Sequence, residues 1–119
     1  MIPAKAVGGD MYDFILLEND SIAIAIGDVA DKGVPAALFM AMVRSFLRAE
    51  TRAGVSPLRI LQRVNRHIMD MNEKGIFVTV LLGILNSTNK QYTYARAGHE
   101  RPILIDDRGI ARQLSMGQG

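Results

Sequence analysis

The sequence predicts an α+β fold in which a packed antiparallel helix pair lies on antiparallel β-sheet. Two observations lead to this class: strand-like apolar runs occupy both ends of the chain, and two helical patterns lie between them. A third is that most of the strand-like runs are joined by connections of hairpin length, which makes the strands antiparallel. The 119 residues, with 49% hydrophobic and 22% charged side chains, suit one globular domain.

The first predicted hairpin lies near the N-terminus. Met11–Leu17 and Ser21–Asp28 flank the polar cluster Glu18-Asn19-Asp20, which is typical of a turn. In the second of these strands one face is bulky, whereas the other carries residues small enough for close approach. The bulky residues are Ile22, Ile24 and Ile26, and the small residues are Ala23, Ala25 and Gly27.

Two helices are predicted next. Pro35–Ala53 follows Gly33 and ends at Gly54, and its first half is apolar on every side, so we expect this helix to be buried between layers. Ser56-Pro57 begins the second helix, which extends to about Lys74 and carries apolar residues at every third or fourth position. The short connection predicts that the two helices are antiparallel.

The remaining strands follow the helices. Ile76–Leu85 is a continuous apolar run rich in β-branched residues, which predicts a central strand covered on both faces. The turn Asp106–Gly109 predicts an antiparallel hairpin near the C-terminus. The other predicted strands are Gln91–Ala97, Ile103–Ile105 and Ile110–Leu114.

Composition excludes several functional classes. Cysteine is absent, which excludes disulfides, thiolate zinc sites and a cysteine nucleophile. No apolar run approaches the roughly 20 residues that cross a bilayer, and no signal peptide is recognisable, so we expect a cytoplasmic protein without a membrane span. The formal net charge is +2, and no basic run is interleaved with aromatic residues, so nucleic-acid binding is not expected.

Two aspartates are candidate metal ligands. If the first hairpin turns near Asn19, Asp10 and Asp28 lie opposite each other at one end of the sheet. Two carboxylates that close repel unless a proton or a cation lies between them, and oxygen ligands suit Mg²⁺ or Mn²⁺. Nearby glycines permit positive φ and close approach to a ligand, although glycine and aspartate are also ordinary turn residues. These glycines include Gly9, Gly27 and Gly33.

Side-chain nucleophiles are scarce, and the two histidines are ambiguous. His67 lies on the polar side of the second helix, where we expect a solvated residue. His99 ends a strand at a tight turn. It either stabilises the turn by hydrogen bonding or lies near an active site. We therefore assign no catalytic side chain.

Four motifs in one order resemble those of a known family. They are Val7–Phe14 (VGGDMYDF), Gly27–Ala37 (GDVADKGVPAA), Phe77–Thr79 (FVT) and Ala97–His99 (AGH). Together they resemble the bacterial PPM-type (protein phosphatase 2C-like) serine/threonine phosphatases of the sporulation stage II protein E and sigma-B regulator branch. The resemblance implies an αββα sandwich of two antiparallel sheets flanked by helix pairs.

The resemblance also implies a chemistry. Two Mn²⁺ or Mg²⁺ ions would activate a water that hydrolyses phosphoserine or phosphothreonine, without a phosphoenzyme. Asp10 and Asp28 would be carboxylate ligands, the Val29 carbonyl would complete part of the shell, and Gly9, Gly27, Gly33 and His99 would support the turns. The implied substrate is a phosphorylated anti-sigma factor antagonist, and a sensor or receiver domain is expected upstream.

Family members continue to further metal carboxylates beyond the motifs found here. We therefore expect residues 1–119 to be the N-terminal two-thirds of one incomplete phosphatase domain, whose exposed sheet edge favours self-association. The alternative is a non-catalytic signalling module that keeps the fold and binds a partner without a complete metal site.

Overall fold

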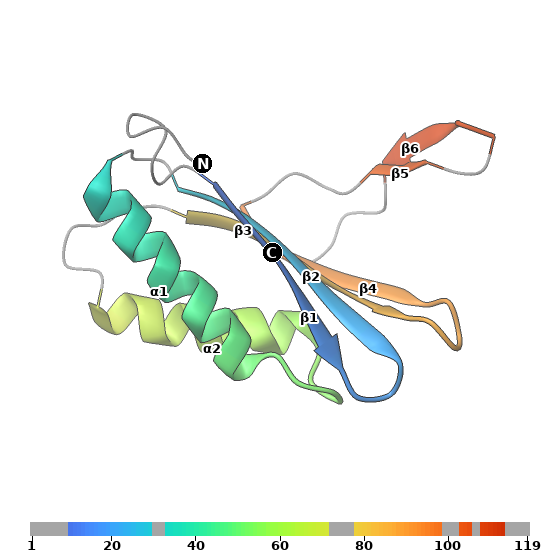
Figure 1. Cartoon of the computed structure of the whole chain (residues 1–119), viewed down its shortest axis with the longest axis horizontal. Coiled ribbons are helices and arrows are strands. Elements are labelled where there is room, and N and C mark those ends of the chain that lie inside the picture. The colour runs from blue at the N-terminus through green and yellow to red at the C-terminus, as the bar shows by residue number, and fades with distance from the viewer. Residues whose placement is uncertain (1–9, 30–32, 72–77, 99–102, 106–107, 114–119) are drawn as a thin grey trace.

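The predicted α+β class is confirmed by the computed structural model, which describes residues 10–29, 33–71, 78–98, 103–105 and 108–113 (Figure 1). The elements are β1 (Asp10–Leu17), β2 (Ser21–Val29), α1 (Val34–Glu50), α2 (Pro57–Met71), β3 (Val78–Asn86), β4 (Tyr92–Ala97), β5 (Ile103–Ile105) and β6 (Ala111–Gln113). Strands β1 to β4 form one antiparallel sheet in chain order, and β5 pairs with β6 in a separate hairpin. Neither described helix is long and apolar enough to cross a membrane.

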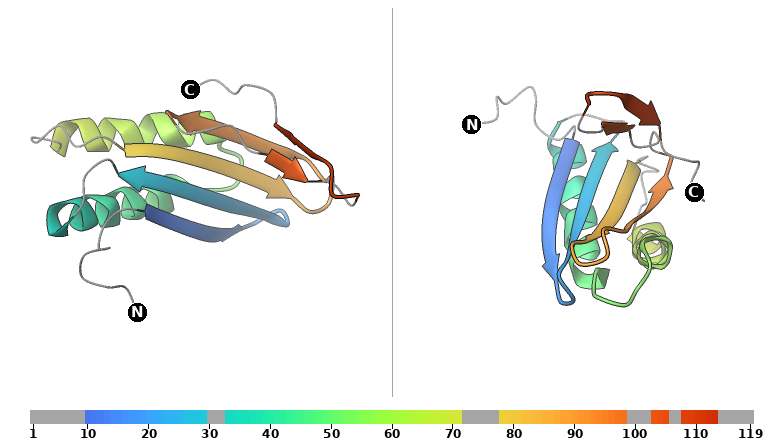
Figure 2. Two further views of the ribbon diagram at one scale, coloured as in Figure 1. Left: turned by 90° about the horizontal axis from the view of Figure 1, so that it is seen from above. Right: turned by 90° about the vertical axis from the view of Figure 1, so that its right-hand side faces the viewer.

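Both helices pack on the same face of the four-stranded sheet, and the β5–β6 hairpin lies on the other side (Figure 2). We call these the helix face and the outer face of the sheet. The small residues of β2 lie on the helix face, as their alternation with isoleucine predicted, and they let the helices approach closely. The core between the layers includes Ala23, Ala25, Phe39, Val43, Leu47, Ile60, Val64, Val80, Leu82 and Ala95.

Local sequence explains where the helices begin and end. Gly33 has φ 96° directly before α1, a conformation that glycine adopts without strain. The helix ends at Glu50, three residues before the predicted end, because Thr51 is extended and its N–H donates to the Leu47 carbonyl. The Ser56 hydroxyl accepts the Arg59 N–H at 3.2 Å and so caps α2. The predicted extension of this helix to Lys74 lies outside the described residues.

Two expectations about burial hold only in part. Helix α1 is covered on one face only, since Val34 and Leu38 are 64% and 65% exposed, and no described element packs over them. Strand β3 is central, as predicted, and helices cover its helix face. On its outer face Leu81 is buried but Leu85 is exposed, so the expected cover on both faces holds for only part of the strand. In both cases an apolar run continues across a surface that the described part of the chain leaves open.

The turn between β1 and β2 fixes the register of the first hairpin. Asn19 and Asp20 have φ 67° and 56°, which asparagine and aspartate tolerate better than most residues. The Asp20 carbonyl accepts both the N–H and the hydroxyl of Ser87, at 2.9 and 2.8 Å, so the two hairpin turns of the sheet are joined. We call this contact the turn clasp. It lies at the end of the sheet opposite the candidate metal ligands.

Candidate metal centre

Asp10 and Asp28 face each other across β1 and β2. The register pairs them directly, as the position of the turn predicted. Both side chains are exposed, and the alternation of the strands places them on the outer face, since their neighbours Met11 and Gly27 are buried on the helix face. Directly opposed residues of an antiparallel pair have Cβ atoms about 4.5–5.5 Å apart, so the two carboxylates share one small region.

A third oxygen-bearing side chain extends this row. Thr79 of β3 pairs with Asp28, and the same alternation places it on the outer face. Asp10, Asp28 and Thr79 therefore form one line across three strands. The sequence alone does not place Thr79 in this row, because the pairing of β2 with β3 joins segments separated by both helices.

Gly27 contributes through packing and not through a turn. It lies inside β2 outside the positive-φ region, so the expectation of a turn glycine is wrong here. A Cβ at this position would lie 3.2 Å from Met11 Cγ, 3.4 Å from the Thr79 carbonyl oxygen and 3.5 Å from Met40 Cε. The missing side chain lets α1 pack closely beneath Asp28. Gly33, in contrast, has the positive φ that was expected.

The structure says less about the predicted roles of the other site residues. The Val29 side chain is buried on the helix face, and its strand position pairs with Val78. A role for the Val29 carbonyl as a ligand stays a prediction. Gly9 and His99 lie outside the described residues.

The oxygen atoms of Asp10, Asp28 and Thr79 are chemically suited to a hard divalent cation, but they are few. Carboxylate and hydroxyl oxygens are the ligands that Mg²⁺ and Mn²⁺ prefer. Within the described residues, no group of three or more histidine, cysteine, aspartate or glutamate side chains comes together. The described part of the chain thus supplies two carboxylates to this centre.

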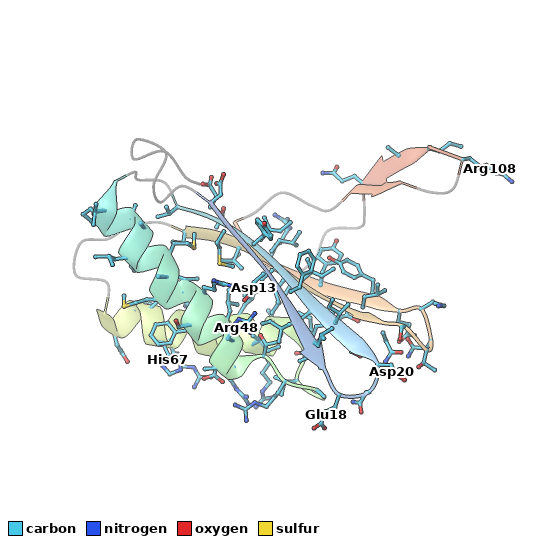
Figure 3. The ribbon with its side chains drawn as sticks, viewed as in Figure 1. Asp13, Glu18, Asp20, Arg48, His67 and Arg108 are labelled. Atoms are coloured by element: carbon cyan, nitrogen blue, oxygen red, sulfur yellow. The ribbon has the colours of Figure 1, made fainter. Side chains whose placement is uncertain are left out.

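Asp13 belongs to a different kind of site, on the helix face of β1. It is only 5% exposed, and Arg48 of α1 grips it with Nε 2.7 Å from Oδ2 and Nη2 2.8 Å from Oδ1 (Figure 3). Arg44 adds a contact of 3.3 Å. The Arg48 hydrogen bond, assisted by Arg44 and opposed by burial, lowers the pKa of Asp13 to about 2. This carboxylate joins β1 to α1 and is not available to the metal centre.

The described contacts of His67 also hold two elements of the fold together. Its ring stacks on Phe46 with centroids 4.8 Å apart, and Nε2 lies 2.9 Å from Glu50 Oε2. The histidine therefore joins α2 to α1, which is more than the solvated position that the sequence predicted. The pKa of Glu50 is lowered, chiefly by this hydrogen bond.

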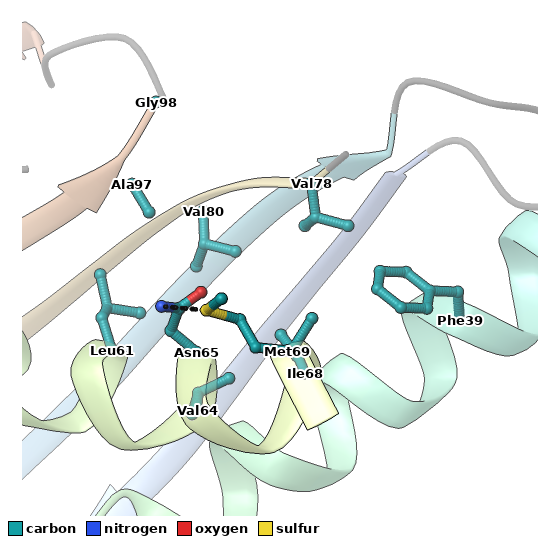
Figure 4. A pocket seen from close by; sticks show the side chains of 10 residues that line it. All are labelled: Phe39, Leu61, Val64, Asn65, Ile68, Met69, Val78, Val80, Ala97 and Gly98. Atoms are coloured by element: carbon teal, nitrogen blue, oxygen red, sulfur yellow. Dashed lines mark hydrogen bonds between the residues drawn. The ribbon is translucent and has the colours of Figure 1, made fainter. Parts of the chain in front are cut away.

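A hollow lies between α2 and the strands β3 and β4 (Figure 4). Its lining is apolar, with residues such as Phe39, Leu61 and Val80. Within it the Asn65 amide donates to Met69 Sδ at 3.6 Å. Among the described residues that line this hollow, none carries a carboxylate or a cationic group.

Comparison with known proteins is consistent with the motifs. Residues 18–119 match the family described as Stage II sporulation protein E (SpoIIE). Phosphoserine phosphatase RsbU of Bacillus subtilis (strain 168) is 38% identical over 99 residues, which are 83% of this chain and 29% of RsbU. Protein IcfG of Synechocystis sp. (strain ATCC 27184 / PCC 6803 / Kazusa) is 34% identical over 139 residues, covering 94% of this chain and 22% of IcfG.

A solved structure has the same fold. The RsbU and RsbW domains of Rv1364c from Mycobacterium tuberculosis superpose with a TM-score of 0.79 at 33% identity, covering 92% of this chain and 31% of that one. The chain thus spans less than a third of the length of each of these three relatives.

Proposed function

The chain belongs to the Stage II sporulation protein E family, and on this premise we propose that it forms part of a metal-dependent serine/threonine protein phosphatase domain. The observation that carries the proposal is the direct pairing of Asp10 with Asp28 at the exposed end of β1 and β2. Two neighbouring carboxylates of this kind are stable together when a cation lies between them.

Each residue of the centre has a proposed task. Asp10 and Asp28 hold the cation through their carboxylates, and the Val29 carbonyl adds a neutral oxygen. Thr79, which pairs with Asp28 across β2 and β3, helps to orient the Asp28 carboxylate. Bound there, Mn²⁺ or Mg²⁺ would lower the pKa of water and neutralise phosphoryl oxygens. Two ions are proposed for the complete domain, with further carboxylates from outside the described residues.

The proposed substrate is a phosphoserine or phosphothreonine on a regulatory protein. RsbU carries the name phosphoserine phosphatase, which supports this class. We propose more narrowly a phosphorylated anti-sigma factor antagonist, a cytoplasmic location and control by a sensor or receiver domain upstream. Self-association stays a prediction, supported by the exposed Tyr12, Phe14 and Leu16 on edge strand β1.

One observation favours the alternative, a signalling module without catalysis. Among the described residues, only two carboxylates reach the centre. A domain that keeps this fold but binds no metal would still present the same surfaces to a partner.

A calorimetric Mn²⁺ titration of the chain tests the proposed Asp10–Asp28 centre. We expect saturable binding that Asp10→Asn and Asp28→Asn each weaken by more than the roughly 10- to 100-fold typical of outer-shell changes. Glu18→Gln, which removes an exposed carboxylate beside the β1–β2 turn, is the matched control and should bind like the wild type. Binding that survives both substitutions would refute the site, and no binding by the wild type would mean that the chain holds at best half of the metal site.

A further inference from the structure

The outer surface of α2 carries a line of arginines, Arg59, Arg63 and Arg66, which we call the arginine face. Their spacing of four and three residues places them on one side of the helix. The apolar residues of α2, such as Ile60 and Val64, are buried against the core on the opposite side.

Charge is distributed unevenly along the chain. Residues 34–71 contain six arginines and two acidic residues, a net charge of +4. The rest of the chain contains eight basic and ten acidic residues, a net charge of −2. The helix pair is therefore strongly basic, although the whole chain is nearly neutral.

Little of the charge on the arginine face is compensated. Arg63 lies 3.9 Å from Glu50, but that carboxylate is already bound by His67 at 2.9 Å. Arg59 and Arg66 are exposed and form no ion pair with any residue that the structure describes. Arg44 and Arg48, on the other helix, are engaged by Asp13 and do not contribute.

Helix stability alone does not account for these arginines. Arg59 is the third residue of α2, directly after the Ser56 cap, where glutamate or glutamine would complete a capping box. A cation there also faces the positive end of the helix dipole. Arg59–Arg63 and Arg63–Arg66 are like-charge neighbours, which destabilise an isolated helix.

We propose that the arginine face is a docking surface for an acidic helix of a partner protein. Arg59 and Arg66 are seven residues apart, about 10 Å along the helix, so carboxylates at positions i, i+4 and i+7 of a partner helix match the three arginines. Guanidinium groups bind carboxylates with two parallel hydrogen bonds, which gives such a contact geometric selectivity.

The surface suits a protein better than a nucleic acid. Among the described residues of α2 there is no aromatic side chain other than His67, whose ring is stacked on Phe46, so bases have no platform. The arginine face lies on the helix layer and the Asp10–Asp28 pair on the outer face of the sheet, so docking leaves the proposed metal centre open and does not depend on it.

Fluorescence anisotropy with designed peptides tests this surface. The probes are capped helical peptides of about 20 residues: one with glutamates at i, i+4 and i+7, one with glutamines there, and one with the same glutamates spread around the helix. We expect the first to bind the wild-type chain at least about fivefold more tightly than either other peptide. Arg66→Gln should weaken this binding about threefold, and Arg59→Gln/Arg66→Gln about tenfold.

Lys90→Gln is the matched control, because it removes one exposed positive charge from the β3–β4 turn. It should leave peptide affinity within about 1.5-fold of the wild type, and circular dichroism should show that every variant is folded. Equal binding of the aligned and spread peptides, or an equal loss in Lys90→Gln and Arg66→Gln, would overturn the proposal. Tighter binding of a short DNA duplex than of the aligned peptide would also overturn it, in favour of a nucleic-acid surface.

Discussion

The two faces of the sheet use aspartate in opposite ways. On the helix face, Asp13 is buried with its cations, Arg48 and Arg44, and serves to fix β1 against α1. On the outer face, Asp10 and Asp28 are exposed and lie beside a like charge. The difference teaches that a carboxylate held by arginines of the same chain fixes two elements together, whereas two carboxylates held next to each other form an arrangement that a bound cation stabilises.

The largest expected effect contrasts two leucines of the same sheet. Leu82 on the helix face is 0% exposed and Leu16 on the outer face is 83% exposed. Leu82→Ala should lower the free energy of unfolding by about 2–5 kcal/mol, because it removes a packed side chain and leaves a cavity. Leu16→Ala should change the same quantity by less than about 0.5 kcal/mol. Urea denaturation of both variants measures this, and equal losses would mean that the outer face is also packed in solution.

The next effect concerns pH and Asp13. Its pKa falls from 3.8 to about 2 on folding, so the folded state favours the carboxylate form. The resulting stabilisation, about 2 kcal/mol, is fully present above the unfolded pKa and is lost as pH falls through about 2. Urea denaturation between pH 5 and 2 should show this loss in the wild type and a shallower one in Asp13→Asn. Identical slopes would show that Asp13 is not ion-paired in solution.

The smallest effect separates paired from unpaired arginines. Arg48→Gln removes the bidentate contact to Asp13, whereas Arg59→Gln removes a charge that has no ion-pair partner among the described residues. We expect the urea midpoint at pH 7 to fall for Arg48→Gln. For Arg59→Gln we expect an unchanged or slightly higher midpoint, since a cation at a helix N-terminus is unfavourable. A fall of equal size in both variants would remove the distinction between paired and unpaired arginines.

The features that the sequence predicted best are those that depend on short-range pattern. The register of Asp10 with Asp28 follows from a turn centred near Asn19, because an antiparallel hairpin with a known turn has only one pairing. The side of β2 that carries alanine and glycine could likewise be identified from period-two alternation.

The features that were missed depend on contacts far apart in the chain. Asp13 and Arg48 are separated by 35 positions, and nothing in either neighbourhood predicts that they meet. Thr79 joins the row of Asp10 and Asp28 only through the pairing of β2 with β3. The burial of α1 was overestimated because an apolar run does not say how many layers will cover it.

The turn clasp between Asp20 and Ser87 has a consequence for engineering the chain. Loops accept tags, insertions and cleavage sites where their backbone hydrogen bonds are few. At the β1–β2 turn, the Asp20 carbonyl is held by two donors from the neighbouring hairpin, so an insertion there would loosen both hairpins together. Among the described residues nothing lies within 4 Å of the place where a Cβ of Gly109 would stand, so a label beside this residue has room, whereas a side chain at Gly109 itself would be strained by its φ of 79°.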